Sequence, residues 1–367
     1  MTVYYLPIEP LNERYTEQWY RWFPAEFARQ GLECVVLDGE PLIQDEIRVG
    51  TFLDINSTLH YKAEQLKKVA DLFHRGLVKP GDCFFVADIE FFGIEAIRYL
   101  SVLNNIKVKL VGFAHAGSYT RGDFMEPCIP FARVYERGWG EICDYLCVGS
   151  HYHRENLITL RLSDRGARNV VVTGNPYLLE EIQTPERTEL IENKANLPPL
   201  IIHSNRPDKE KNPRQALYVF SLLARRNPEW KFAVCTSRKV WGSGSLRTDA
   251  LAMRSERFSV FEGLSKKQYL DLLASSTVML SCSPEENFGY CVLEAAALGC
   301  MPVLRNCASH PELLGDEFAH LLYSGTLGNA VEVIERTVAN PKPTEITRVA
   351  EKYKDSLSTI VKLCRPS

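Results

Sequence analysis

Short apolar, β-branched runs alternate with longer helical patterns along the whole chain, and this alternation constrains the fold more than any other feature. Near-continuous apolar strands that are separated by helices are typical of a parallel sheet covered on both faces. We therefore predict an α/β fold built from doubly wound parallel sheets. The predicted strands cover residues 3–8, 34–39, 82–88, 108–115, 145–150, 169–174, 200–205, 231–237, 258–264, 278–283, 301–306 and 320–324.

The alternation is interrupted at 176–198, a polar stretch with prolines at both ends that indicates a linker with one short helix. The chain of 367 residues is also longer than the ~100–200 residues of one typical domain. We predict an N-terminal domain over 1–177, a second domain over 178–345, and an amphipathic C-terminal helix over 346–367 that packs back toward the N-terminal domain. Because ligands bind at strand carboxyl ends in open α/β sheets, both domains would present such loops to a cleft.

The composition is that of an ordinary globular protein. Hydrophobic residues make up 45% of the chain, and the formal net charge of −3 gives no general attraction to nucleic acid or to an anionic membrane. The cysteines number 11, show no paired C-x-x-C spacing and lie mostly in apolar runs, which favours a reduced chain without a zinc or disulfide framework. We see no run of the ~18–20 apolar residues that span a bilayer. We therefore expect a soluble, cytoplasmic protein.

The most informative stretch is 281–313, which predicts a strand, a tight loop, a helix that begins near Phe288, a stop at Gly299 and another strand. Glu286 lies at the strand-to-helix junction, and Glu294 follows on the helix. Their separation along a helix is ~12 Å, too far for both carboxylates to share one atom. They would contact different parts of one extended ligand. Taken alone, they could equally be surface glutamates of an amphipathic helix.

The start of this predicted helix suits a phosphate. Asn287, Phe288 and Gly289 would place free backbone N–H groups there. Unsatisfied donors and the helix dipole both favour an anion at such a position.

The segment resembles the E-x7-E donor-binding element of retaining glycosyltransferases with the GT-B architecture. It is most similar to the large family that includes sucrose- and lipopolysaccharide-type transferases, whose pattern is S-x-x-E-G-F-G-x-x-x-x-E-A-x-A-x-G-x-P-V. The resemblance implies two facing Rossmann-like domains and a nucleotide-sugar donor, UDP- or GDP-linked with UDP favoured. It also implies that Glu286 contacts the transferred sugar and Glu294 the ribose. Asn287 replaces the usual glycine, and Asn is the residue best tolerated there after glycine. The matching residues are Ser283, Glu286, Phe288, Gly289, Glu294, Ala295, Ala297, Gly299, Pro302 and Val303.

A second segment, 201–213, is similar to the family's G-R-x-x-x-x-K-N element. The resemblance implies that Arg206 and Lys211 neutralise the donor diphosphate, with Asn205 beside them as a donor-binding residue. Negative charge builds up on the leaving phosphate as the glycosidic bond breaks, so fixed cations stabilise the transition state. Two such cations and a helix N-terminus can replace a divalent ion, so we expect no metal and no other cofactor. Without the E-x7-E element, a solvated charged turn would be the better interpretation.

In the first domain, His115 ends a predicted strand. In the resembling family a histidine at a comparable strand end often faces the donor sugar, which makes His115 a catalytic candidate, although a lone strand-end histidine can equally be structural. Asp88 and Glu90 follow another strand and are candidates for acceptor binding. Their alternative role is capping of a helix that begins near Phe91.

The loop after the first predicted strand departs from the family, which usually carries a glycine-rich loop there. Residues 7–22 are instead bulky and polar, with Arg14 and Tyr15 as acceptor-binding candidates or as ordinary surface residues. A different loop implies a different acceptor. The T-G-N-P-Y segment at 173–177 resembles the family's inter-domain turn and is expected at the floor of the cleft.

The acceptor is indicated by weaker features. The segment with G-C-x-P-V, and with H-P-E where the family often has G-G-x-x-E, looks closer to transferases that act on modified nucleobases. These include the tRNA-queuosine mannosyltransferase group and bacteriophage enzymes that glycosylate hydroxymethylated pyrimidines in DNA. Basic stretches at 151–169 and at 225–247, the latter with Trp230 and Trp241, suit phosphate attraction and base stacking. They could equally be ordinary basic helix faces.

We therefore predict a retaining glycosyltransferase whose acceptor is a hydroxyl on a hydroxymethylated pyrimidine in DNA. It would act in the host cytoplasm if the chain is encoded by a phage. The alternatives are a transferase that acts on a tRNA base, one that acts on a glycan or lipid carrier of surface polysaccharide synthesis, and a non-catalytic or phosphorylase-like relative. A lipid-carrier transferase would need an exposed amphipathic face on the first domain, and the sequence offers no strong basic–aromatic helix of that kind. The identity of the sugar and the oligomeric state stay open.

Overall fold

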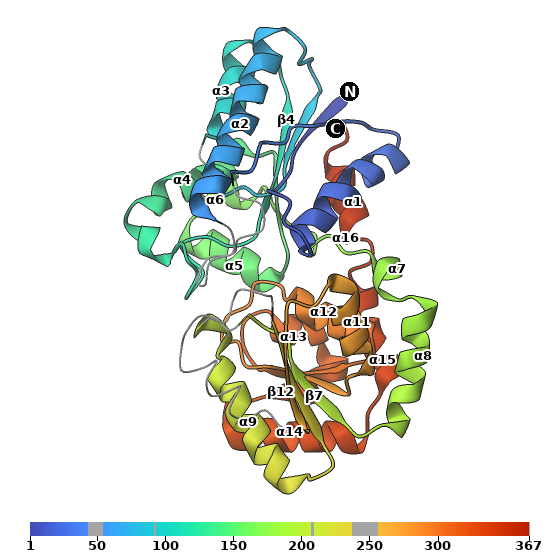
Figure 1. Ribbon diagram of the computed structural model, residues 1–367. Coiled ribbons are helices and arrows are strands. Elements are labelled where there is room, and N and C mark those ends of the chain that lie inside the picture. Colours follow the sequence, from blue (N-terminus) through green and yellow to red (C-terminus); the bar gives the residue numbers. More distant parts are fainter. Residues whose placement is uncertain (43–53, 92, 207–208, 237–255, 367) are drawn as a thin grey trace. The chain divides into compact units, whose positions relative to one another are not determined.

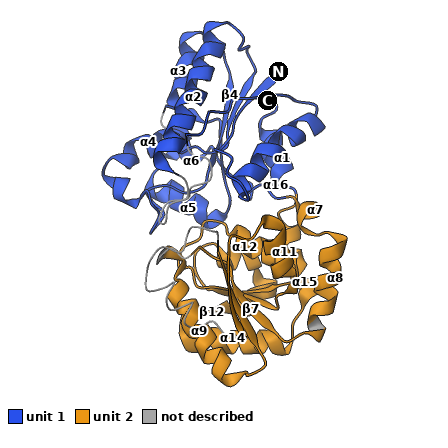
Figure 2. Ribbon diagram, in the orientation of Figure 1, with its two compact units in different colours: residues 1–47, 51–177, 355–367 blue, residues 48–50, 178–354 orange. Residues whose placement is uncertain are grey.

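The computed structural model describes residues 1–42, 54–91, 93–206, 209–236 and 256–366. These residues form two compact units, each built on a six-stranded parallel sheet with helices on both faces (Figures 1 and 2). The predicted α/β class is therefore confirmed. Among the helices of the described residues, none combines the length and the apolar content that a membrane crossing needs.

The first unit contains the described residues up to Tyr177 and the C-terminal segment from Asp355 (Figure 2). Its strand order is β2-β1-β3-β4-β5-β6, so the order reverses between β1 and β3. The strands are β1 (Thr2–Leu6), β2 (Glu33–Val36), β3 (Cys83–Val86), β4 (Lys109–Ala114), β5 (Tyr145–Val148) and β6 (Val170–Val172). The helices are α1 (Tyr15–Arg29), α2 (Ile55–His74), α3 (Glu95–Leu103), α4 (Ile129–Ile142), α5 (His151–Leu160), α6 (Asp164–Ala167) and α16 (Ser356–Leu363).

The second unit contains the described residues of Leu178–Lys354. Its strand order is β12-β11-β10-β7-β8-β9, so the order reverses between β7 and β10. The strands are β7 (Leu200–His203), β8 (Lys231–Thr236), β9 (Phe258–Glu262), β10 (Val278–Ser281), β11 (Met301–Arg305) and β12 (Leu322–Tyr323). The helices are α7 (Leu179–Ile182), α8 (Pro185–Asn193), α9 (Pro213–Arg226), α11 (Lys266–Ser275), α12 (Tyr290–Ala297), α13 (His310–Leu314), α14 (Leu327–Ala339) and α15 (Pro343–Glu351).

Aromatic side chains fill the face of the first sheet that α1 covers. Tyr5 of β1 stacks on Phe85 of β3 with ring centroids 5.6 Å apart, and Phe23 of α1 packs on both. Trp19 and Phe27 lie one turn before and one turn after Phe23 and are fully buried. Because residues four apart share one face of a helix, these rings make the apolar stripe that fixes α1 on the sheet.

Two predicted segments need correction. The stretch 176–198, predicted as a linker with one short helix, holds α7, α8 and the 3-10 helix Lys194–Asn196. The single helix predicted after residue 345 is two helices, α15 and α16, separated by a turn at 352–355. The second unit extends to Lys354, so it includes α15.

The break between α15 and α16 has a packing reason. The buried face of α15, which includes Ile346 and Val349, packs on α12 of the second unit. The buried face of α16 packs on α1 of the first unit, where the Gln30 side chain donates to the backbone oxygen of Ser358 over 3.3 Å. The turn at 352–355 therefore separates a helix that packs in the second unit from one that packs in the first.

Candidate active site

The carboxyl edge of the second sheet brings together the two segments that the sequence patterns singled out. β7 and β10 are neighbours, with Ile201 opposite Val278, and the strand order reverses between them. In open α/β sheets, ligands bind outside the carboxyl ends of the strands at such a reversal. The segment Ser204–Arg206 follows β7, and Cys282–Gly289 follows β10.

Lys211 and Glu286 form an ion pair across this edge, with 2.8 Å between Nζ and Oε2. Their side chains are only 15% and 17% exposed, so this is not a solvated turn. Burial opposes ionisation of both groups, but their mutual attraction outweighs it: the pKa of Lys211 is raised and the pKa of Glu286 is lowered. Both groups are therefore held in their charged forms.

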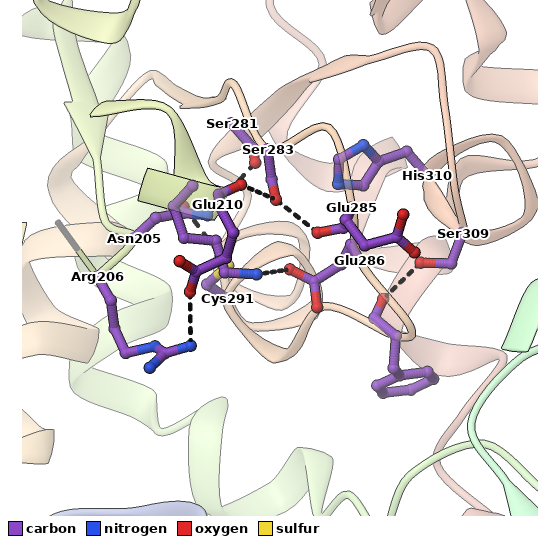
Figure 3. Close-up of polar contacts among 12 residues, drawn as sticks. Asn205, Arg206, Glu210, Ser281, Ser283, Glu285, Glu286, Cys291, Ser309 and His310 are labelled. Carbon is purple, nitrogen blue, oxygen red and sulfur yellow. Dashed lines mark hydrogen bonds and ion pairs between the residues drawn. The ribbon is translucent and has the colours of Figure 1, made fainter. Parts of the chain in front are cut away.

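A second cation lies on the same loop. The Arg206 guanidinium contacts Glu210 over 3.0 Å and its side chain is 30% exposed (Figure 3). The Ser283 hydroxyl lies 2.6 Å from the backbone oxygen of Glu285 and 3.3 Å from that of Glu210, which joins this loop to the one after β10 (Figure 3). The structure thus brings Arg206, Lys211 and Glu286 together.

The helix that carries Glu294 begins at Tyr290 rather than near Phe288, because Gly289 adopts a left-handed conformation with φ of 97° and acts as the N-cap. A Cβ added at Gly289 would also lie 3.3 Å from Cγ of Glu286. Asn287, which replaces the family's glycine, has no positive φ, so the glycine requirement of this turn lies at Gly289.

Phe288 is a packing residue of the turn. Its ring is 3% exposed and meets the ring of Tyr353 edge-on at 5.1 Å. Its backbone oxygen accepts a hydrogen bond from the Ser309 hydroxyl over 3.3 Å. Phe288 therefore shapes the loop through its ring, and only its backbone N–H remains a candidate for donor binding.

Glu294 lies on α12 and is almost fully buried. Its carboxylate forms an ion pair with Lys266, the first residue of α11, whose ammonium also lies 5.3 Å from the ring centroid of Tyr269. The sequence patterns did not identify Lys266. The only available signal was its place just after the carboxyl end of β9, another strand of the same sheet.

Asn205 is buried behind these charges. Its side-chain amide donates to the Ser281 hydroxyl over 3.4 Å and accepts a weak contact from the Cys291 thiol over 3.8 Å. Burial raises the pKa of that thiol to about 12, so Cys291 stays protonated. Asn205 therefore links β7, β10 and the first turn of α12.

His310 is a second residue that the patterns missed as part of the site. Its Nδ1 lies 2.8 Å from the carbonyl oxygen of Arg305, which can only accept, so Nδ1 carries the proton. Burial lowers the pKa of His310, although the nearby Glu286 carboxylate opposes the shift. The imidazole is therefore neutral. Its hydrogen bond to the carbonyl oxygen of Arg305 stabilises the turn after β11. In this turn Ala308 has a positive φ of 52°.

In the first unit, His115 follows β4 and its Nε2 donates to the carbonyl oxygen of Ala87 over 2.8 Å. The imidazole packs against the rings of Trp19 and Phe113, both with centroids at 4.9 Å, and against Tyr15 at 5.9 Å. Burial lowers its pKa, so the ring is neutral. The structure thus places His115 and Tyr15 at the same carboxyl edge.

Asp88 and Glu90 lie at the end of β3, next to β4, and they do not cap a helix. α3 begins only at Glu95, and Asp88 instead pairs with Lys62 of α2 over 2.6 Å and accepts from the backbone N–H of Glu90 over 3.2 Å. Burial, and then the Asp88 charge, raise the pKa of Glu90 to about 8. Arg14 is the N-cap residue of α1, one position before Tyr15.

The basic stretches are only partly available for phosphate binding. In 151–169, Arg161 is buried against Glu136 at 2.5 Å, and Arg154 contacts Glu155 over 2.8 Å. In 225–247, Arg226 contacts Glu335 over 3.4 Å. Trp241 lies outside the described residues. The T-G-N-P-Y segment at 173–177 ends the first unit, with Tyr177 buried.

Metal ligation has no obvious place in the described part of the chain, where no group of three or more His, Cys, Asp or Glu side chains is arranged to hold an ion. The polar centre of the second unit consists instead of lysine, arginine and glutamate side chains around the reversal between β7 and β10.

Comparison with known proteins agrees with this geometry. Residues 186–353 match the model of the family described as glycosyl transferases group 1. A tRNA-queuosine α-mannosyltransferase of Drosophila melanogaster is 25% identical over 119 residues, which are 32% of this chain and 31% of that protein. The match therefore spans about a third of the curated relative's length.

Solved structures resemble the chain over nearly its whole length. Sucrose-phosphate synthase of Thermosynechococcus elongatus superposes with a TM-score of 0.67 at 12% identity, covering 99% of this chain and 96% of that one. HepE of Anabaena, solved in complex with UDP, gives a TM-score of 0.65 at 14% identity, covering 99% and 98%. The chain therefore has the GT-B fold, and residues 186–353 are similar to the group 1 glycosyl transferases.

Proposed function

We propose that this chain, with its GT-B fold and its similarity to group 1 glycosyl transferases, transfers a sugar with retention from a UDP-linked donor to an acceptor hydroxyl, without a metal ion. One observation carries the proposal above the others. The buried Lys211–Glu286 pair lies with Arg206 at the strand reversal where an α/β sheet binds its ligand.

The proposed roles follow from charge. Arg206 and Lys211 bind the diphosphate and stabilise the negative charge that develops on it when the glycosidic bond breaks. In the absence of donor their charges are balanced by Glu210 and Glu286, so both cations are kept partly out of water and ready for an anion. The N-terminal turn of α12 adds backbone N–H groups and a favourable dipole.

The two spaced glutamates divide the rest of the donor between them. Glu286, ionised beside Lys211, accepts hydrogen bonds from hydroxyls of the transferred sugar, and Glu294 accepts them from the ribose. Retention rests on the similarity of the 283–303 segment to retaining transferases. UDP as the nucleotide rests on the UDP complex of HepE, and His115 is proposed to face the donor sugar.

The proposed acceptor is a hydroxyl on a modified nucleobase, first of all a hydroxymethylated pyrimidine in DNA. Its support is the partial similarity to a protein named for its action on tRNA-queuosine, together with the H-P-E variant of the donor segment. A flipped base would suit the first-unit edge of Tyr15, His115 and Glu90, where an aromatic ring and polar groups lie together.

One observation favours a lipid-carrier acceptor instead. The sequence patterns offered no exposed basic–aromatic helix in the first unit, but α4 presents Phe131 and Val134 to solvent at 56% and 80% exposure. Arg133 and Arg137 are exposed on the same helix. Apolar and basic side chains on one helix surface are the features by which proteins bind anionic membrane surfaces.

The test is a donor and acceptor panel. The protein is incubated in EDTA with UDP-, GDP- and ADP-linked sugars, and nucleoside diphosphate release is measured with hydroxymethylated DNA, unmodified DNA, tRNA or lipid-carrier vesicles. We expect UDP release that hydroxymethylated DNA accelerates, and a product whose anomeric configuration by NMR equals that of the donor. An inverted product, or release that requires an added divalent ion, would refute the mechanism. If only the lipid-carrier vesicles accelerate the release of the nucleoside diphosphate, the acceptor is a lipid carrier rather than DNA.

A further inference from the structure

The carboxylate proposed to bind ribose already has a cation as its partner. Glu294 is 5% exposed, and the Lys266 ammonium contacts its Oε1. Burial of a carboxylate is costly unless a group of opposite charge contacts it. Lys266 therefore supplies the charged partner of the buried Glu294 side chain.

The helix start fixes where the Lys266 backbone lies, but it gives no reason for a lysine at this position. Ser265 and Gln268 form a reciprocal capping box, so the first turn of α11 is well defined. A lysine in this turn faces the positive end of the helix dipole, which is unfavourable. Each lysine here is balanced by a carboxylate: Lys267 by Asp271 at the surface, and Lys266 by Glu294 inside the site.

The ammonium of Lys266 lies where a ligand can reach it. The side chain is 24% exposed, in contrast to 7% for the carboxylate that it contacts. Its Nζ also lies 5.3 Å from the ring centroid of Tyr269, one turn further along α11. The carboxylate and the aromatic ring thus hold the ammonium next to the group that is proposed to bind the ribose.

We propose that Lys266 is a second ribose-binding residue. Its ammonium donates a hydrogen bond to the oxygen of a ribose hydroxyl, and the Glu294 carboxylate accepts a hydrogen bond from the same hydroxyl. This inference rests on the proposed function and adds to it a residue and a chemical requirement. Each hydroxyl of a cis-diol is both a donor and an acceptor, so a carboxylate alone satisfies only half of its hydrogen bonding. The Lys266–Glu294 pair satisfies both halves and makes the site selective for ribonucleoside diphosphates.

The experiment compares ligands that differ only in the ribose. Binding of UDP and of 2′,3′-dideoxy-UDP is measured by calorimetry for the wild type, K266M, K266R, E294Q and K267M, after thermal unfolding has shown that each variant is folded. We expect K266M to weaken UDP binding about tenfold, as loss of one charge-assisted hydrogen bond does. K266R should retain most of the affinity. K267M, which removes an exposed lysine of the same turn, should bind as the wild type does.

The dideoxy ligand separates ribose binding from general electrostatics. Without the two hydroxyls, K266M and the wild type should bind equally within about twofold, and E294Q should add no further loss. Equal UDP binding by K266M and the wild type would overturn the inference, and so would an equal loss on both ligands, which would place the ammonium at the diphosphate. If the wild type prefers GDP or ADP, the same series is run with that nucleotide. If it binds none of the three, the proposed function itself fails.

Discussion

The two units have the same sheet architecture, and each places a lysine–carboxylate pair at the point where the strand order reverses. Each sheet reverses its strand order, between β1 and β3 in the first unit and between β7 and β10 in the second, and each reversal carries a lysine–carboxylate pair. Lys62 meets Asp88 over 2.6 Å in the first, and Lys211 meets Glu286 over 2.8 Å in the second. The lysine comes from a helix, α2, in the first unit and from the strand-end loop in the second.

The pKa of a carboxyl group is shifted in opposite directions at the two edges. In the second unit Lys211 lowers the pKa of Glu286, and Arg206 adds another cation, so the edge suits a diphosphate. In the first unit Lys62 is shared between Asp88 and the backbone oxygen of Glu90, which leaves the Glu90 carboxyl to be protonated by burial, with a pKa of about 8. That edge suits a neutral, hydroxyl-bearing group better than a phosphate.

The largest expected effect tests which edge holds the leaving group. K211M should lower both sugar transfer and acceptor-free donor hydrolysis about 100-fold, because it removes a cation that stabilises the departing diphosphate. K62M should lower transfer while leaving donor hydrolysis within about threefold of the wild type. Steady-state UDP release with and without acceptor measures both rates.

The matched control for this comparison is the K62M/D88N double variant, which removes the charge that K62M alone leaves buried without its partner. It should unfold at a higher temperature than K62M and still hydrolyse the donor. Equal losses of donor hydrolysis in K62M and K211M would show that the two edges do not divide the substrates as proposed.

A smaller effect concerns stability against pH and should have opposite signs in the two units. The folded-state pKa of Glu90 is raised, so its contribution to stability is present below pH ~4.5 and is lost as the pH rises through about 8. The folded-state pKa of Glu286 is lowered, so its contribution is present above its unfolded pKa and is lost as the pH falls. Relative to the wild type, E90Q should therefore gain about 4 kcal/mol between pH 5 and pH 8.5.

The E286Q variant is the internal reference for this experiment. Its deficit relative to the wild type should shrink as the pH falls from ~4.5, where the unfolded chain takes up the proton, toward the lower folded-state pKa of Glu286, where the folded wild type takes it up as well. Urea unfolding at each pH gives the free energies. If E90Q shows a pH-independent difference from the wild type, Glu90 is ionised in the folded state and the contrast between the two edges fails.

The difference between the units also explains what the sequence could predict. All the predicted strands are present, because buried parallel strands have an apolar signature that is local in the sequence. In the proposed donor site, Glu286, Glu294, Arg206 and Lys211 belong to two segments that resemble patterns of a known family, so the sequence could single them out. Lys266 is fixed only by its tertiary contact with Glu294, which no local spacing reveals.

Other predictions were wrong because of the backbone conformation of one turn or because of a contact between residues distant in the sequence. The start of α12 was misplaced because the left-handed conformation belongs to Gly289 rather than to Asn287. The capping role considered for Asp88 was wrong because Lys62, distant in sequence, takes its carboxylate instead. In the first unit the acceptor candidates had no pattern behind them, yet Asp88, Glu90, Tyr15 and His115 lie at one edge because parallel strands end together.

The smallest expected effect concerns the turns that follow the first strand of each sheet. Glu13 with φ of 62° precedes the N-cap of α1, and Asn212 with φ of 50° is the N-cap of α9, so both turns place a non-glycine residue in the left-handed region. Asn, with its short side chain, tolerates this region better than Glu does. E13G should therefore stabilise the protein by about 0.5 kcal/mol, after the entropic cost of glycine is subtracted. N212G should be neutral or destabilising, because it also removes the hydrogen bond to Gln215.

Urea unfolding of both variants measures the difference. A larger gain for N212G than for E13G would mean that the second turn is the more strained of the two, and that the donor loop, rather than the first-unit loop, stores backbone strain.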